Sequence, residues 1–63
     1  MKKTIGRRLR DMRGDKTQAQ VAKDLGISPS AVASYENNVR IPRDPLKRSF
    51  AEYYGTTVQD LFF

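Results

Sequence analysis

Residues 18–35 read QAQVAKDLGISPSAVASY, and this stretch predicts two short helices joined by a tight turn. Val21, Ala22 and Leu25 are spaced three and four positions apart, so they form one apolar face of the first helix. Gly26 follows directly. A glycine just past the end of a helix readily adopts the left-handed conformation that turns the chain. We therefore expect the first helix to end at a turn around Gly26.

Capping residues stand in front of both expected helices. Thr17 precedes the first helix and Ser28 precedes the second. The hydroxyl of such a residue accepts a hydrogen bond from the free N–H groups of the first turn. Pro29 follows at the first helical position, where its missing N–H costs nothing. We expect the second helix to run from Pro29 to about Asn37.

Two short helices around a glycine turn form the helix-turn-helix unit, expected here over about residues 17–37. The stretch resembles the phage repressor and Cro type of this motif, the XRE family. The resemblance implies that residues 1–63 are a single all-α, lambda-repressor-like DNA-binding domain of five helices. It also implies a transcriptional regulator that binds a palindromic operator as a homodimer, with repression the commoner mode. The resemblance rests on residue types at matching spacings: Gln18, Ala22, Gly26, Val32 and Tyr35.

The composition disfavours an enzyme. The chain has 63 residues and contains no cysteine and no histidine. Disulfides and thiolate metal sites are therefore excluded, and the commonest general base and metal ligand is missing. No apolar run approaches the roughly 18 residues that a membrane-spanning helix needs. We expect a cytoplasmic, bacterial nucleoid-associated protein without enzymatic activity, metal, cofactor, membrane contact or small-molecule ligand.

Positive charge is concentrated in two parts of the chain, which has a formal net charge of +5. Two basic clusters on either side of an exposed helix favour a polyanion as the partner, here double-stranded DNA. The alternative is that these side chains only make a small domain soluble. The first cluster is Lys2, Lys3, Arg7, Arg8, Arg10, Arg13 and Lys16, and the second is Arg40, Arg43, Lys47 and Arg48.

A helix is expected before the motif, from Thr4 as its cap to Arg13. Ile5, Leu9 and Met12 are spaced as the inner stripe of this helix. Relatives of the resembling family often have two more residues in the following connection and an apolar residue just before the threonine. Here that residue is Lys16, so the core contact is missing or is made by the lysine stem.

Two more helices are expected after the motif. Asn38 tolerates the left-handed conformation well, so it can end the second helix of the motif in place of the family's usual glycine. Asp44 is expected to cap the fourth helix, which would end at Gly55. Thr57 is expected to cap a short last helix.

The small exposed residues of the second motif helix are the candidates for base contacts. In this kind of motif the N-terminal part of that helix reads base edges in the major groove. No residue there can make a bidentate contact with a base, so we expect modest direct readout, supplemented by water bridges and DNA shape. The alternative for Ser28 and Pro29 is that they only start the helix. The candidates are Pro29, Ser30, Ala31, Ala33 and Ser34.

Phosphate contacts are expected at both ends of the motif. Gln18 opens a helix, where backbone N–H groups and the helix dipole favour an anion, and the resemblance assigns the matching glutamine this role. The alternative for the arginines is solvated loop charge, and Lys2 and Lys3 are expected to form a flexible basic arm. The candidate phosphate ligands are Thr17, Gln18, Asn37, Arg40 and Arg43.

Glu36 is an acidic residue on a helix expected to face DNA. The resembling family pairs a glutamate at this place with an arginine of the first helix. Allowing for the short connection, the matching residue is Arg13. The resemblance therefore implies a structural ion pair between Arg13 and Glu36.

The C-terminal residues are the candidates for a dimer interface, since relatives dimerise through this region. So short a final helix is not expected to bury all of its apolar residues. The alternative is that Phe62 completes the core and Phe63 is merely exposed. The candidates are Tyr54, Val58, Leu61, Phe62 and Phe63.

Two other functions use the same fold. A protein-interaction module, such as an antitoxin or antirepressor, would use these helices to bind a protein, and the small uncharged face of the second motif helix leaves this open. RNA binding is less favoured because the sequence contains no aromatic stacking platform or RNA-binding motif.

Overall fold

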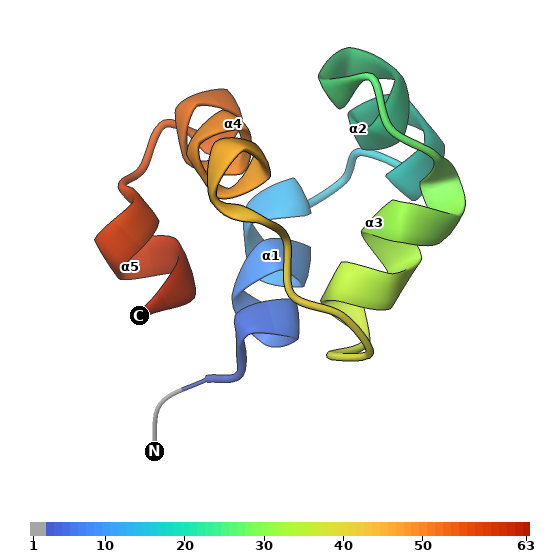
Figure 1. Cartoon of the computed structure of the whole chain (residues 1–63). Helices are drawn as coiled ribbons and strands as arrows, with labels where there is room; N and C mark the ends of the chain where they lie inside the picture. Colours follow the sequence, from blue (N-terminus) through green and yellow to red (C-terminus); the bar gives the residue numbers. More distant parts are fainter. Residues whose placement is uncertain (1–2) are drawn as a thin grey trace.

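The computed structural model describes residues 3–63, which form five α-helices and no strand (Figure 1). The predicted all-α, five-helix architecture is confirmed. Lys2 of the predicted basic arm lies outside the described residues. Within residues 3–63, no helix is long and apolar enough to cross a membrane. The helices are α1 (Ile5–Arg13), α2 (Gln18–Leu25), α3 (Pro29–Glu36), α4 (Asp44–Tyr54) and α5 (Val58–Phe62).

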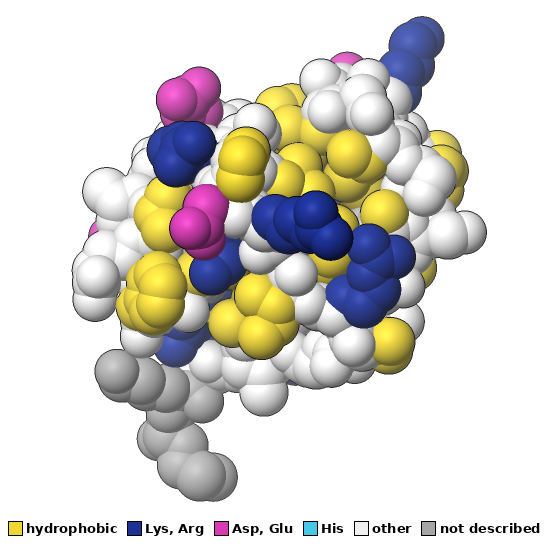
Figure 2. Space-filling view, in the orientation of Figure 1, with side chains coloured by type: hydrophobic (Ala, Val, Ile, Leu, Met, Phe, Trp, Pro, Cys, Tyr) yellow, Lys and Arg dark blue, Asp and Glu magenta, His cyan; other side chains and the backbone are white. Residues whose placement is uncertain are grey.

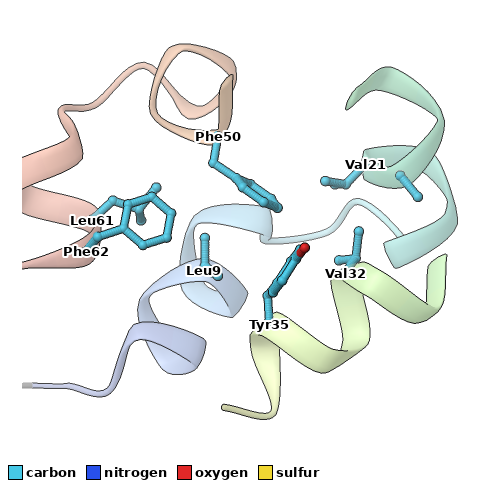
Figure 3. Close-up of a cluster of buried hydrophobic side chains, with 8 residues drawn as sticks. Leu9, Val21, Val32, Tyr35, Phe50, Leu61 and Phe62 are labelled. Carbon is cyan, nitrogen blue, oxygen red and sulfur yellow. The ribbon is translucent and has the colours of Figure 1, made fainter. Parts of the chain in front are cut away.

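Helix α1 lies in the middle of the molecule, with α2 and α3 on one side and α4 and α5 on the other (Figure 1). One apolar core joins the helices, and Figure 3 shows its side chains converging from all five. Phe50 is its centre: the Phe50 ring lies 6.0 Å from that of Tyr35, 6.1 Å from Tyr54 and 6.4 Å from Phe62. Such aromatic pairs each add about 0.5–1.5 kcal/mol beyond the apolar area that they bury.

The buried face of α1 differs from the predicted one. Leu9 is buried and Ile5 packs against the core, both as expected, but Met12 is 42% exposed, so its assignment to the inner stripe is wrong. Gly6 is the other buried residue of α1, and Arg13 is largely covered. Gly6 and Arg13 both meet Glu36 of α3, so the buried face of α1 extends toward α3 and leaves Met12 at the surface.

Gly6 allows α1 and α3 to approach closely. A Cβ atom at this position would lie 2.1 Å from the carbonyl oxygen of Glu36, far inside van der Waals contact. Asn38 adds polar contacts at the same crossing: its Oδ1 accepts from the Gly6 N–H at 2.9 Å, and its Nδ2 donates to Thr4 Oγ1 at 3.2 Å. Asn38 has the predicted left-handed backbone, with φ of 61°. Its side chain thereby fastens the end of α3 to the start of α1.

The start of α4 also differs from the prediction. Asp44 is the first residue of the helix and not its cap. Arg43 occupies the cap position and makes no side-chain capping hydrogen bond. The carboxylate of Asp44 still lies in the first turn, where a negative charge interacts favourably with the helix dipole. The consequence is that Arg43 has extended backbone and precedes the helix.

Two lysines of the N-terminal region are held by specific partners. Lys16 has no core contact: its Nζ donates to the Tyr53 hydroxyl at 2.9 Å and lies 4.6 Å from the centre of that ring. The hydroxyl in turn donates to Asp24 Oδ2 at 2.5 Å, and this hydrogen bond lowers the pKa of Asp24. Lys3 pairs with Asp11 at 2.7 Å on the surface of α1, so it does not extend as a free arm.

We predict that Gly6→Ala destabilises the fold. In an open helix this substitution stabilises by about 0.5–1 kcal/mol. Here the added methyl group meets the backbone of α3, so we expect a net loss of about 1–3 kcal/mol or more. Urea unfolding followed by circular dichroism measures the change, with Arg7→Ala on the exposed face as the control. Unchanged or increased stability of Gly6→Ala would contradict the close approach.

Candidate nucleic-acid interface

Helices α2 and α3 form the predicted helix-turn-helix geometry. Gly26 adopts the left-handed conformation, with φ of 71° and ψ of 32°, and the Ile27 N–H donates to the Ala22 carbonyl at 2.9 Å. Thr17 Oγ1 accepts from the Gln20 N–H at 3.0 Å, and Ser28 Oγ accepts from the Ala31 N–H at 3.1 Å. Both predicted caps and the predicted turn are therefore confirmed.

The small residues on the outer side of α3 differ in how exposed they are. Pro29 and Ser30 are exposed at its first turn, and Ala33 and Ser34 are half-exposed farther along. Ala31 is also half-exposed, and its methyl group packs against the core, so its contact with a base stays a prediction.

Glu36 is buried at the junction of α1, α2 and α3, with an exposed fraction of 3%. The structure brings it together with Arg13, its expected partner. Arg13 Nε donates to Oε2 at 2.7 Å and Nη2 donates to Oε1 at 3.0 Å. Arg13 Nη1 also donates to the Lys16 carbonyl at 2.6 Å, which ties down the connection before α2. The hydrogen bonds to Glu36 raise the pKa of Arg13.

Gln18 has a role that the sequence analysis did not foresee. Its Nε2 donates to Glu36 Oε1 at 3.0 Å, so the amide nitrogen points into the junction and is already engaged. The NH₂ group has two N–H donors, so one is used within the fold and the expected contact with a phosphate would come from the other. The Thr17 hydroxyl accepts from the Gln20 N–H and keeps its own O–H as a donor, which together with the backbone N–H groups of Gln18 and Ala19 suits an anion at the start of α2.

Three expected phosphate ligands lie together beyond the C-terminal end of α3. Asn37, Arg40 and Arg43 are all exposed. Arg40 lies 5.5 Å from the centre of the Tyr35 ring, which orients its guanidinium. Figure 2 shows dark-blue side chains side by side near the centre of this face, over the segment between α3 and α4. A cleft of about 500 Å³ opens here, lined by Tyr35, Arg40, Ile41, Arg43, Pro45 and Leu46.

Arg10 belongs to this group and was not a candidate. Its Nη2 donates to Asn37 Oδ1 at 3.2 Å, across from α1 to the end of α3. The available signal was spacing, because Arg10 precedes Arg13 by three residues and so shares its side of the helix. The predicted inner stripe was set by the spacing of the apolar residues alone. That spacing placed Met12 on the inner face of α1 and gave Arg10 no contact with α3.

The candidate dimer interface is largely part of the core. Leu61 and Phe62 are 2% and 4% exposed, so in the single chain their side chains pack into the core and offer no open surface. Tyr54 and Val58 are partly buried against the same core, and burial raises the pKa of Tyr54 to about 12. Phe63 is 60% exposed, with Lys47 Nζ 5.1 Å from its ring centre. The core is closed by Phe62 because α5 packs back on α1 and α4.

Comparison with known proteins gave one match. A family model described as a helix-turn-helix domain matches residues 4–61, from the cap of α1 to the last turn of α5. Neither the curated proteins nor the solved structures gave a match. The matched range includes α2, its turn and α3, together with every charged residue at the junction around Glu36.

We predict that Arg13 and Glu36 are energetically coupled. Removing one partner leaves a buried charge without compensation, so Glu36→Gln or Arg13→Met alone should each lower stability by about 3–5 kcal/mol. The double variant should lose much less than the sum of the two single losses. Urea unfolding of the four proteins gives the coupling energy. The exposed pair Lys3–Asp11 is the control, and additive losses for Arg13 and Glu36 would show that the pair is not coupled.

Proposed function

The chain belongs to the helix-turn-helix domain family, and from this we propose that it is a transcriptional regulator of the phage repressor and Cro type that binds double-stranded DNA. The observation that carries the proposal is the position of α3. Its first turn projects from the surface while positive groups lie at both ends of the motif. An α-helix fits the major groove of B-DNA, where each base pair presents a distinct set of donors and acceptors.

Ser30, Ala33 and Ser34 are the residues that we propose to face base edges, with Pro29 at the entrance to the groove. A serine hydroxyl donates to or accepts from any base, and an alanine methyl contacts the methyl group of thymine. None of these side chains forms a bidentate pair with one base. Direct readout is therefore modest, and sequence-dependent DNA shape supplies part of the specificity.

Phosphate contacts position α3 in the groove. At one end, the first backbone N–H groups of α2 and the positive end of its dipole bind one phosphate. At the other end, Asn37 and Arg40 bind the next. Arg43 has extended backbone ahead of α4, which lets its side chain reach a narrowed minor groove. These contacts fix the register of the protein on the duplex and carry most of the affinity.

Operator binding requires more base contacts than one small polar helix offers. Two copies related by a two-fold axis double the contacts and recognise a palindrome, and an occupied operator blocks transcription. With Leu61 and Phe62 inside the core, we propose that the seam is centred on Phe63 and includes the accessible edges of Tyr54 and Val58. The two α3 helices would then lie about 34 Å apart, one turn of DNA.

We predict that the affinity for duplex DNA falls steeply as salt rises, because each neutralised phosphate releases counterions. Arg43→Ala should weaken binding and reduce the slope of log K against log salt by about 1. Fluorescence anisotropy with duplex DNA measures both. Arg48→Ala, an exposed change of equal charge on α4, is the control. Absence of duplex binding even at low salt would favour a protein-interaction module.

We predict that the protein forms a dimer through Phe63. Phe63→Ser should shift the equilibrium toward monomer because it removes exposed apolar surface from the seam. Sedimentation velocity at micromolar concentration, with and without DNA, reports the assembly. Val39→Ser is a matched control, because Val39 is 72% exposed but lies in the segment between α3 and α4. A monomer that binds single half-sites without cooperativity would exclude the dimer.

A further inference from the structure

We propose that Arg10 of α1 is a further phosphate-binding residue and that it orients Asn37 toward the same phosphate. This inference rests on the proposed function and deepens it. Arg10 lies outside the helix-turn-helix motif and outside the basic segment that follows it. The fold nevertheless brings its guanidinium from the central helix to the C-terminal end of α3.

Arg10 is not needed to neutralise Glu36. The two carboxylate oxygens already accept three hydrogen bonds, two from Arg13 and one from Gln18. Arg10 Nε lies 4.0 Å from Glu36 Oε1, which is the outer limit of an ion pair and too far for a hydrogen bond. The Arg10 side chain is 52% exposed, against 18% for Arg13. Arg10 is therefore only loosely paired with Glu36, and its half-exposed guanidinium can also reach a ligand.

The contact with Asn37 determines which way that amide points. A guanidinium only donates hydrogen bonds, so the oxygen of the amide must face Arg10 and the NH₂ group must point away from it. Among residues 3–63, the hydrogen bond from Arg10 is the contact that the Asn37 side chain makes. The freed NH₂ group of Asn37 and the N–H groups of Arg10 that face away from Glu36 are adjacent donors. A phosphate oxygen only accepts, so these donors match it.

The end of α3 also requires a positive group if a phosphate is to bind there. A helix C-terminus carries partial negative charge, which repels an anion. Glu36, one residue before Asn37, adds a full negative charge that Arg13 compensates within the junction. Arg10 and Arg40 supply the outward-facing positive charge at this end. Arg10 thus converts an unfavourable helix end into a phosphate site.

The experiment compares Arg10→Met with Arg7→Met in the full chain, using a random-sequence duplex of about 30 base pairs, three helical turns. Arg7 is on the same helix, is 62% exposed and pairs with Asp11, so its variant removes the same charge. We expect Arg10→Met to bind about tenfold more weakly, with the salt slope reduced by about 1. Arg7→Met should change both much less.

A double-mutant cycle tests the orientation of Asn37. We expect Asn37→Ala to weaken binding in the parent chain but to add little in the Arg10→Met background, because the amide is then no longer oriented. Thermal melts identify any variant that fails to fold, and in that case Arg10→Ala takes the place of Arg10→Met in the cycle, since alanine also removes the charge and every donor.

The possible outcomes separate this proposal from the proposed function. Equal effects of Arg10→Met and Arg7→Met on a parent chain that binds duplex DNA would overturn the phosphate site and leave DNA binding intact. Additive losses for Arg10 and Asn37 would overturn the positioning role. A parent chain that binds no duplex DNA would overturn both proposals.

Discussion

The arrangement of α1, α2 and α3 depends on one buried carboxylate, that of Glu36. Moving this charge out of water costs several kcal/mol, and the cost is offset only when its oxygens are satisfied in good geometry. Arg13 supplies two hydrogen bonds from α1 and Gln18 supplies one from α2. These three helices can therefore come together in few other ways without leaving a buried charge unpaired. Arg13 extends the constraint to the connection before α2 through the Lys16 carbonyl.

The close crossing of α1 and α3 adds a steric constraint near the start of α1. Gly6 permits the backbones to touch, and Asn38 bonds the start of α1 from the end of α3. A chain of this size buries only about 60% of its unfolded surface, so each such contact is a large part of its stability. The result is a fixed position for the last turn of α3 and for the segment that follows it, where the exposed basic residues lie.

This construction explains the character of the candidate interface. The face of α3 consists of small side chains, while the groups that suit phosphates come from three other places: the start of α2, the segment after α3, and α1. Under the proposed function, affinity for DNA would depend mainly on charge and on the geometry of the scaffold, and less on individual base contacts. Gln18 shows the same division, because its side-chain amide supports the scaffold while its backbone N–H belongs to the first turn of α2, which has no partner within the helix.

The sequence by itself determined the local features of this protein. Thr17, Gly26, Ser28 and Asn38 act through their own backbone and nearest neighbours, so their roles follow from residue type and position. The pairing of Arg13 with Glu36 came from family resemblance, since no periodicity links residues so far apart in the chain.

Only the tertiary structure decided which side of each helix is buried. The apolar spacing of α1 placed Ile5 and Leu9 correctly, but it did not show that Gly6 and Arg13 meet α3 while Met12 is exposed and Arg10 contacts Asn37. In the same way, Leu61 and Phe62 are buried because α5 packs on α1 and α4, and the direction from which a neighbouring helix packs is not encoded in any local stretch.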